Sequence, residues 1–439
     1  MPPDIPSEVL GEIFHFALHA PVSNVDGSSF PWHLGWVCKT WRRALLAYPK
    51  LWATITLNLR LHTQYDTLEK VYNRLLLYLR RSGDHPLNLT LHIPAEFNED
   101  QRQTWNAIWK TILSCSHRWE SIALAGNDAL EFHDLDLCKG NLPLLKRFSI
   151  CTFSSFDCDV FHQAPCITDV TLCFMYEIVS HRWMFPWSQL VIFKMAMVEI
   201  SSHALQVLLE NLRGIQELHL SYRSGQPPNL SFPPTYLSHL RVLDVNFHQI
   251  LQVIMAPSLL ELRLEMEPEE YRLFGEEAER FDLEVVETFI ELSACHLRKL
   301  ALMGFRAAFA KSLVDIFPYL EELCIDILDG SCNLLELLLT DEQGFVAFPK
   351  LRLFTLICGA KYVDEKVETI TSILESRNSS HIGAPPSISV VPLEKIVLQL
   401  KQEWHIRAHL FHYPIPIPSA FKNAISKWAS FKVDVQIDQ

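Results

Sequence analysis

The chain has 439 residues, of which 49% are hydrophobic and 20% charged, so it can bury a large core and should form about two to three domains. Lys and Arg total 38 against 51 Asp and Glu, which gives a formal net charge of -13. An acidic chain is poorly suited to neutralising phosphates, so we expect neither nucleic acid nor an anionic membrane as a partner.

Glycine and cysteine spacing exclude several kinds of site. The closest glycines, Gly27 and Gly35, are too far apart for phosphate loops and nucleophile elbows, which need glycines about five or fewer positions apart. No CxxC pair is present among the 11 cysteines, and their odd number argues against an extracellular disulfide framework. The sequence also lacks a secretory signal or a long apolar run. We therefore expect a soluble protein of the cytoplasm or nucleus that needs no cofactor.

The first fifty-odd residues predict two short helices followed by a strand. Apolar residues recur at helical spacing over 5–18 and again over 34–45, and the intervening 20–32 contains Pro, Asn, Asp and Gly. Alternating apolar residues over 55–61 predict the strand. Such helices usually pack on each other, but below about 60 residues they bury too little surface to be stable alone. Part of the apolar stripes should therefore pack on the rest of the chain or on a partner.

Three sequence blocks in this region resemble the F-box motif. They are Ile5-Pro6-x-Glu8-Val9-Leu10-x-Glu12-Ile13-Phe14, Val37-Cys38-x-x-Trp41-Arg42 and Pro49-x-Leu51-Trp52. The region is similar in particular to the F-box proteins that are abundant in mushroom-forming (basidiomycete) fungi, and the similarity ends near residue 55. The connection over 20–31 is longer than the compact F-box usually has.

This resemblance implies a contact with a Skp-type adaptor, which in turn holds a cullin scaffold and a RING subunit in an SCF-type E3 ubiquitin ligase. Apolar helical anchors supply the affinity of such contacts, and Trp and Arg are the usual hot spots. By position, the adaptor-binding residues that the resemblance implies are Ile5, Pro6, Val9, Leu10, Ile13, Phe14, Leu34, Val37, Cys38, Trp41, Arg42, Leu51 and Trp52. Leu51 and Trp52 either extend that contact or attach the helices to the following domain.

A hexapeptide with apolar residues at positions 1, 4 and 6 recurs eleven times from residue 119 onward. The copies begin at Trp119, Leu145, Ile167, Leu190, Ile215, Leu240, Leu259, Leu297, Leu320, Leu351 and Leu393. Most steps between copies are 19 to 31 residues, the length of a leucine-rich repeat. Several intervals contain an amphipathic segment, at 204–209, 283–292, 305–317 and 363–374, which predicts helices between the strands.

These features predict an α/β fold in which a short all-helical F-box precedes an irregular leucine-rich-repeat solenoid of parallel strands and helices. The steps are unequal and a regular Asn or Cys ladder is missing, so we expect the solenoid to be irregular. An ordinary α/β sheet is the alternative, because the hexapeptide also fits a buried strand end. We expect the F-box at 1–55, a transition segment of strand and amphipathic helices (67–81 and 99–113) at 56–115, and the repeats at 116–439.

Positions 3, 5 and 7 of such strands point away from the core, onto the open face of the sheet. Mixed charges on a rigid scaffold suit the recognition of a protein target, although simple solvation is the alternative for any single residue. The residues predicted to point outward are Arg147, Asp169, Lys194, Glu217, His219, Asp244, Glu261, Arg263, Glu265, Lys299, Glu322, Asp326 and Lys395. All of these except Glu265 and Asp326 are candidate target-binding residues.

Three other clusters are given non-catalytic interpretations. The acidic segment 265–287 coincides with a 38-residue step and indicates a solvated insertion loop. Three histidines in 405–412 share a helical spacing, but the prolines after them and the lack of a nearby carboxylate or thiol argue against a metal site. Four cysteines in 151–173 match no zinc pattern, and we expect them to be small buried residues.

The sequence therefore predicts a non-catalytic adaptor. Its helices would hold the Skp-type subunit, and its repeats would keep a protein target near a ubiquitin-charged conjugating enzyme, which raises effective concentration. An F-box and leucine-rich scaffold acting outside ubiquitination is the alternative, and recovery of a cullin separates the two. An enzyme would instead need convergent polar groups in a deep cleft.

Overall fold

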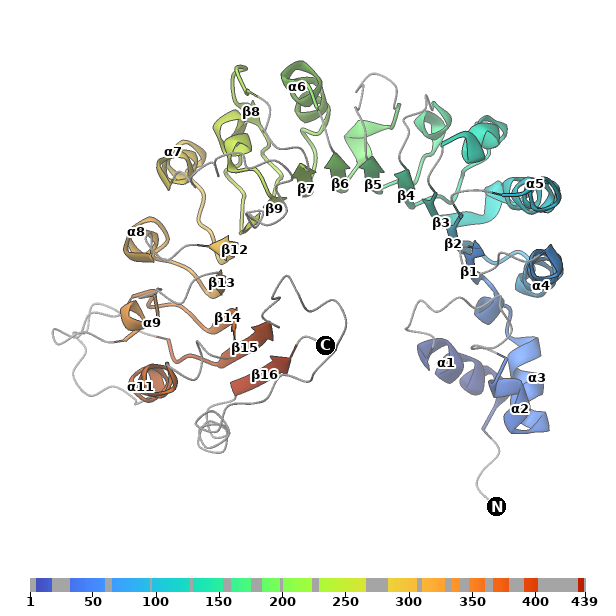
Figure 1. The fold of residues 1–439 in the computed structure, drawn as a ribbon, viewed down its shortest axis with the longest axis horizontal. Coiled ribbons are helices and arrows are strands. Elements are labelled where there is room, and N and C mark those ends of the chain that lie inside the picture. Colours follow the sequence, from blue (N-terminus) through green and yellow to red (C-terminus); the bar gives the residue numbers. More distant parts are fainter. Residues whose placement is uncertain are drawn as a thin grey trace. The chain divides into compact units, whose positions relative to one another are not determined.

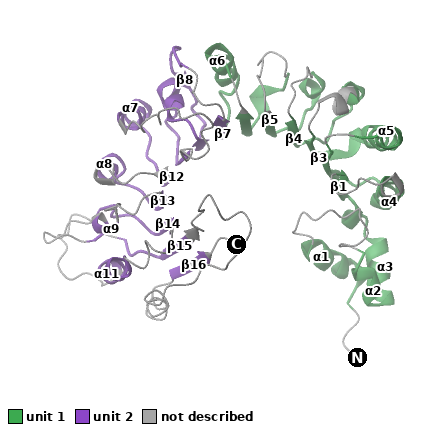
Figure 2. Ribbon diagram, viewed as in Figure 1, with its two compact units in different colours: residues 1–215 green, residues 216–439 purple. Residues whose placement is uncertain are grey.

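In a computed structural model, the chain divides into two compact units, Met1–Ile215 and Gln216–Gln439 (Figure 2). In each unit parallel strands alternate with helices or 3-10 turns, and the helices lie on one side of the strands (Figure 1). The structure describes residues 5–17, 32–59, 65–94, 97–126, 129–152, 159–174, 184–197, 200–222, 229–265, 283–305, 310–327, 334–339, 347–359, 366–378, 391–401 and 433–437. No described helix is both long and apolar enough to cross a bilayer.

Unit 1 begins with a group of short helices. They are α1 (Ser7–Ala17), α2 (Leu34–Val37), α3 (Lys39–Ala47) and the 3-10 helix η1 (Pro49–Trp52). The apolar stripe over 34–45 predicts one helix, but the structure has two, because Cys38 is extended (φ -159°, ψ 172°). The Cys38 Sγ accepts a hydrogen bond from the Trp41 backbone N at 3.4 Å and so caps α3. A stripe of apolar residues does not reveal such a break, since both helices keep the same face inward.

Six parallel strands follow among the described residues of unit 1, and their order in the sheet is their order in the chain. They are β1 (Thr54–Asn58), β2 (Leu87–His92), β3 (Trp119–Ala125), β4 (Arg147–Thr152), β5 (Asp169–Phe174) and β6 (Ile192–Met197). The connections are α4 (Tyr65–Ser82), α5 (Glu99–Ser114), η3 (Ser116–Arg118), η4 (Ala129–Cys138), η5 (Val160–Gln163) and η7 (Trp187–Gln189), and α6 (Ser202–Asn211) follows β6. The segment 56–115 thus supplies most of β1 and all of β2, paired in the same ladder as the repeats.

Local sequence explains the longer helices of unit 1. Asn98 and Gln101 form a reciprocal capping box at the start of α5, with hydrogen bonds of 2.9 and 3.1 Å. The buried face of α5 then presents Trp105 and Trp109, whose rings stack at 5.8 Å. Helix α4 ends close to Gly83, which has a positive φ of 54° that suits glycine.

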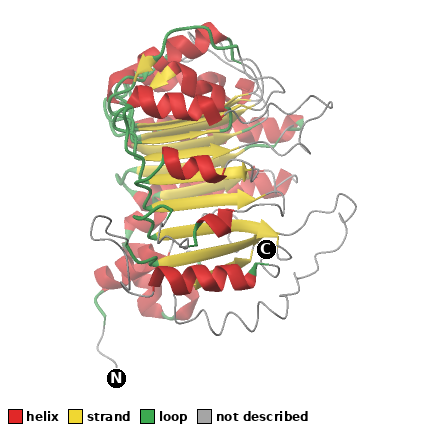
Figure 3. Cartoon of the chain, turned by 90° about the vertical axis from the view of Figure 1, so that its left-hand side faces the viewer, coloured by secondary structure: helices red, strands yellow, loops and turns green. Residues whose placement is uncertain are grey.

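Among its described residues, unit 2 continues the pattern with eight parallel strands, again in chain order within the sheet. Figure 3 shows the strands side by side, with their arrows in the same direction. They are β7 (Glu217–Tyr222), β9 (Val242–Val245), β11 (Glu261–Glu265), β12 (Lys299–Phe305), β13 (Glu322–Ile327), β14 (Leu353–Gly359), β15 (Lys395–Lys401) and β16 (Val433–Ile437). The remaining elements are η8 (His248–Val253), α7 (Leu283–Ser293), α8 (Ala310–Ile316), α9 (Leu334–Leu337), α11 (Val367–Asn378) and a small sheet of β8 (Thr235–Tyr236) and β10 (Ile254–Met255).

All eleven predicted hexapeptides coincide with strands, and all of their apolar positions 1, 4 and 6 are buried. In β11, for example, Leu259, Leu262 and Leu264 are 0%, 0% and 3% exposed. Within each unit every strand pairs with the next strand along the sheet, without the order reversal of a doubly wound sheet. The predicted fold class, a leucine-rich-repeat type of α/β solenoid preceded by short helices, is confirmed.

Candidate protein-interaction surfaces

One side of α1 is apolar and exposed. Ile5, just before the helix, and Val9, Ile13 and Phe16 are 46%, 48%, 50% and 73% exposed. Their spacing of four, four and three residues places them on one helical face, which we term the α1 apolar face. The opposite side carries Leu10 and Phe14, which are buried. Helix α1 is therefore apolar on both sides, and among the described residues the side with Leu10 and Phe14 is buried while the other side is largely exposed.

Close packing and one hydrogen bond hold α1 in this orientation. A Cβ on Gly11 would lie 2.5 Å from Cδ2 of the Tyr48 ring, so the ring packs directly on the helix backbone. The Tyr48 Oη donates a hydrogen bond to the Glu12 carboxylate, which lowers the pKa of Glu12 and raises the pKa of Tyr48 to about 12. Phe14 contacts the Trp41 ring at a centroid distance of 4.9 Å.

Helix α2 also presents apolar residues to solvent. Trp36 and Val37 are 68% and 60% exposed, and we term them the α2 apolar pair. Their neighbour Gly35 is buried, and its carbonyl accepts a 2.8 Å hydrogen bond from the Arg42 Nε. A Cβ on Gly35 would approach the Leu45 side chain to 3.3 Å. The turn that buries Gly35 therefore directs Trp36 and Val37 outward.

The residues that the F-box resemblance assigns to adaptor binding fall into three groups. Ile5, Pro6, Val9, Ile13, Val37, Cys38 and Arg42 are exposed, Leu34 and Trp41 are half-buried, and Leu10, Phe14, Leu51 and Trp52 are buried in the chain's own core. The last four cannot contact a partner in this conformation, which corrects their assignment. Phe16, Trp36 and Leu46 are exposed instead, and the helical spacing from Ile13 to Phe16 is a signal that could have identified Phe16.

Trp52 attaches the short helices to the repeats. It is fully buried, and its Nε1 donates a 2.9 Å hydrogen bond to the Leu45 carbonyl. Its ring meets the Tyr78 ring of α4 edge-on at 5.0 Å, and the Arg81 guanidinium lies 4.3 Å from its centroid. Of the two roles open to Trp52 on sequence, the structure thus favours attachment to the following domain.

The outward-facing charges of unit 2 are largely paired with one another across strands. The Asp244 carboxylate lies 3.1 Å from the His219 Nδ1 and 3.8 Å from the Arg263 Nε. Lys299 Nζ lies 3.0 Å from Glu322 Oε2, a contact that raises the pKa of Lys299. Parallel register explains these pairs, because it places the same repeat position of adjacent strands side by side.

Most of the candidate target-binding residues reach the surface. In unit 1, Arg147 and Lys194 are exposed, Asp169 is half-buried, and Arg147 donates a 3.1 Å hydrogen bond to Asn88. In unit 2, the exposed candidates are Arg263, Lys299 and Lys395, and the half-buried candidates are Glu217, His219, Asp244, Glu261 and Glu322. Lys395 pairs with Asp434 at 3.0 Å. Among the residues predicted to point outward, Asp326 is the exception, because it is only 3% exposed.

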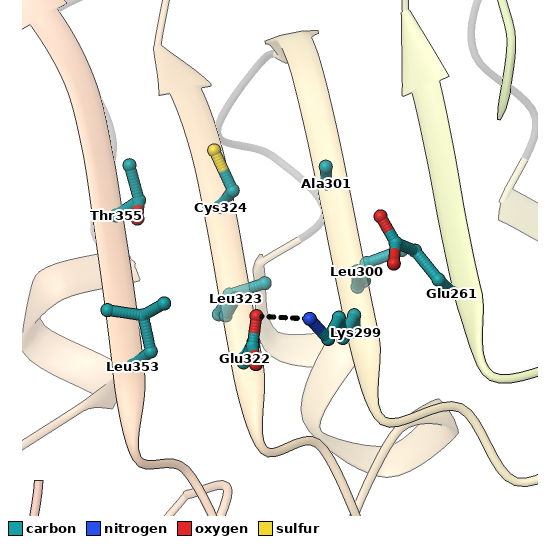
Figure 4. A pocket seen from close by; sticks show the side chains of 9 residues that line it. All are labelled: Glu261, Lys299, Leu300, Ala301, Glu322, Leu323, Cys324, Leu353 and Thr355. Atoms are coloured by element: carbon teal, nitrogen blue, oxygen red, sulfur yellow. Dashed lines mark ion pairs between the residues drawn. The ribbon is translucent and has the colours of Figure 1, made fainter. Parts of the chain in front are cut away.

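A shallow pocket of about 120 Å³ lies on the strand face of unit 2 (Figure 4). Its lining residues are Glu261, Lys299, Leu300, Ala301, Glu322, Leu323, Cys324, Leu353 and Thr355. They come from β11, β12, β13 and β14, so we term it the β11–β14 pocket. It is absent from the sequence-based interpretation, although Glu261, Lys299 and Glu322 are among the candidate target-binding residues.

The described part of the chain contains no group of three or more His, Cys, Asp or Glu residues placed to bind a metal ion. The histidines of 405–412, Cys158, and residues 266–282 of the acidic segment lie outside the described residues. Cys151 and Cys166 are exposed, so the expectation that these cysteines are buried is wrong for both. Cys151 occupies the outward position 7 of its strand, and Cys166 lies in the turn before the next strand.

No protein-family model matches the chain, and no curated protein matches it. Among solved structures, it is similar to a protein from Bacteroides fragilis, with 10% identity over 79% of this chain and 73% of that chain and a TM-score of 0.30. It is also similar to an internalin from Listeria monocytogenes, with 10% identity over 78% of this chain and 91% of that chain and a TM-score of 0.32. The fold described above rests on the strands and their register, to which similarity at this level adds nothing.

Proposed function

We propose that this chain is the target-recognition adaptor of an SCF-type E3 ubiquitin ligase. The α1 apolar face and the α2 apolar pair bind a Skp-type adaptor, and the strand face of the repeats binds a protein target. The observation that carries the proposal is the exposure of Ile5, Val9, Ile13 and Phe16 along one side of a helix whose other side is anchored in the core. Helix-in-groove recognition uses anchors at this spacing.

The exposed apolar area gives such a contact a sufficient driving force. Burying the exposed half of an aliphatic side chain contributes roughly 1 kcal/mol, and a large aromatic such as Trp36 contributes more. Several anchors on α1 and α2 would together supply several kcal/mol, before the cost of association is subtracted. The fixed orientation of α1, held by Gly11, Glu12 and Tyr48, keeps that cost low because the helix is already in place.

The chain's role in this proposal is to position a target. A bound target is presented to the conjugating enzyme at high effective concentration, and the transfer itself needs no side chain of this protein. The rigid ladder of paired strands suits that role, because it presents charged residues in fixed rows.

The test is co-purification of the full-length chain with a Skp-type adaptor and a cullin. Ile13→Glu is expected to reduce adaptor recovery at least tenfold, because it places a charge in the middle of the apolar contact. Leu137→Glu is the matched control, since Leu137 is an exposed leucine (69%) of η4, outside the short helices. Leu10→Ala is unsuitable as a test, because Leu10 is buried and its loss would confuse unfolding with lost binding.

Equal adaptor recovery by the Ile13→Glu variant and the unsubstituted chain would contradict the proposed contact. Recovery of the adaptor without a cullin would instead support the alternative, a scaffold that acts outside ubiquitination. Adaptor recovery tests the helical contact and cullin recovery tests the link to ubiquitination, so the same purification answers both questions.

A further inference from the structure

We propose that the β11–β14 pocket accepts a lysine or arginine side chain of the protein target. The inference rests on the proposed target-binding role of the strand face and specifies the chemistry recognised there. Three features of the pocket carry it: its shape, a carboxylate that forms no hydrogen bond, and the acidic balance of the surrounding strands.

The pocket exists because one row of the ladder changes from large to small side chains. In register, Arg263 of β11 is followed by Ala301, Cys324 and Thr355 of the next three strands. Two residues earlier on each of the first three strands, the outward side chains are longer. These are Glu261, Lys299 and Glu322, which form one border of the pocket (Figure 4). The volume of about 120 Å³ is several times the ~10–15 Å³ that one water requires, so the end of a long side chain has room to enter.

The charges at this border favour a cation. Lys299 lies between Glu261 and Glu322 in the register row, and its ammonium pairs with Glu322 at 3.0 Å. The half-buried Glu261 carboxylate forms no hydrogen bond or ion pair with another described residue, although it does interact electrostatically with Lys299. One carboxylate of the pocket is therefore left without a hydrogen-bonded counterion.

Other classes of side chain fit less well. An acidic side chain would meet two carboxylates and one ammonium, which already pairs with Glu322, and an apolar one would cover Glu261 without providing a hydrogen-bond partner for it. Cys324 adds no charge, because burial raises the pKa of its thiol. A lysine or arginine can insert its apolar stem beside Ala301 and Cys324 while its cationic end pairs with Glu261.

The charge of the surrounding strand face also favours a basic partner. Over β7 to β13, the outward residues that are exposed or half-buried include five acidic residues and two basic ones. The acidic residues are Glu217, Asp244, Glu261, Glu265 and Glu322, and the basic residues are Arg263 and Lys299. This balance attracts a basic segment of a partner and repels an acidic one.

Methyl NMR on the full-length chain tests the pocket directly, because Ala301 and Thr355 carry reporter methyl groups in its lining. The probe is N-acetyl-lysine methylamide, compared with the glutamate and norleucine derivatives. We expect saturable shifts of the Ala301 and Thr355 methyls with the lysine probe and at least tenfold weaker effects with the other two. The absence of shifts with the lysine probe, or equal shifts with all three, would overturn the proposal.

Glu261→Gln removes the charge and keeps the shape, and it should weaken binding of the lysine probe at least tenfold. Glu265→Gln is the matched control, because Glu265 faces outward from the same strand but does not line the pocket. Unchanged binding by Glu261→Gln, with methyl spectra elsewhere intact, would also count against the proposal. The titration contains no adaptor, so a negative result leaves the adaptor contact standing, and loss of adaptor binding leaves this pocket untouched.

Discussion

At the scale of single residues, Trp36 and Trp52 show how burial separates a binding residue from a structural one. Trp52 is enclosed by Tyr78, Arg81 and the Leu45 carbonyl, whereas Trp36 is 68% exposed. Trp52→Ala should cost about 3–5 kcal/mol of unfolding free energy, and Trp36→Ala should change it by less than about 0.5 kcal/mol. Urea denaturation measures both variants. A large loss in Trp36→Ala would mean that this residue is structural.

Tyr48 and Glu12 predict a particular pH dependence for the attachment of α1. The Glu12 pKa is lowered in the folded chain, so its contribution is present above the unfolded pKa near 4.5 and is lost as pH falls through the folded value. The Tyr48 pKa is raised from 10 to about 12, so its contribution is present below pH 10 and is lost as pH rises towards 12. The attachment should therefore be strongest between about pH 4.5 and pH 10.

Glu12→Gln tests this pair, because it removes the charged acceptor of the Tyr48 hydroxyl. The Tyr48 pKa should fall from about 12 towards 10, which carbon NMR of labelled tyrosine rings can follow. Tyr48→Phe identifies the signal. An unchanged Tyr48 titration in Glu12→Gln would show that the hydrogen bond does not cause the shift.

The burial of individual residues is the part that the sequence predicts least well. Helical spacing identifies the apolar residues of α1, but that helix is apolar on two sides, and contacts with Tyr48 and Trp41 decide which side faces inward. The β11–β14 pocket is different, because aligning position 5 of the copies at Leu297, Leu320 and Leu351 would already have placed Ala301, Cys324 and Thr355 side by side. That alignment is a usable signal.

At the scale of elements, the placement of α1 depends on the absence of a side chain at Gly11. In an isolated helix, Gly to Ala would stabilise by about 1 kcal/mol. Here the added Cβ would lie 2.5 and 2.6 Å from Cδ2 and Cγ of Tyr48, atoms near the base of a ring that Glu12 also holds. Gly11→Ala should therefore loosen α1 and increase its hydrogen exchange. Unchanged exchange would show that the ring moves aside at little cost.

In the strands, adjacent positions should differ sharply in their contribution to stability. Lys299 and Glu322 are 47% and 38% exposed, so their ion pair contributes at most about 1 kcal/mol, and Lys299→Ala should be nearly neutral. Leu300 is 2% exposed, and Leu300→Ala should cost about 2–5 kcal/mol. Chemical denaturation of the two variants measures the contrast. Equal losses would contradict the view that position 4 is core and position 3 is surface.

The repeat strands are predictable from sequence because each repeat packs against its neighbours in the same way. This packing requires apolar side chains at positions 1, 4 and 6, which are buried. The hexapeptide pattern does not identify strands β2 and β16. Strand β2 alternates Leu with Asn and Thr, so it reads as a half-buried strand without the first apolar position of a repeat. The apolar pattern also does not predict the break between α2 and α3, because the break depends on the backbone conformation of one residue, Cys38.

At the scale of the whole molecule, the chain carries two chemically different kinds of surface. The short helices of unit 1 expose apolar residues, and the strands of unit 2 expose cross-paired charges with an acidic surplus. Apolar contacts are little affected by salt, whereas contacts between exposed charges are screened. The two proposed partners would therefore bind chemically different surfaces, which the proposed adaptor role requires.

Calorimetric titration of the full-length chain with a purified Skp-type adaptor measures the proposed contact of α1 and α2. We expect saturable binding with a negative heat-capacity change, because apolar surface is buried, and little dependence on salt. We also expect at least tenfold weaker binding for Ile13→Glu, with an unchanged unfolding midpoint, since Ile13 is 50% exposed. Absence of binding by the unsubstituted chain, or full affinity in Ile13→Glu, would contradict the proposed contact.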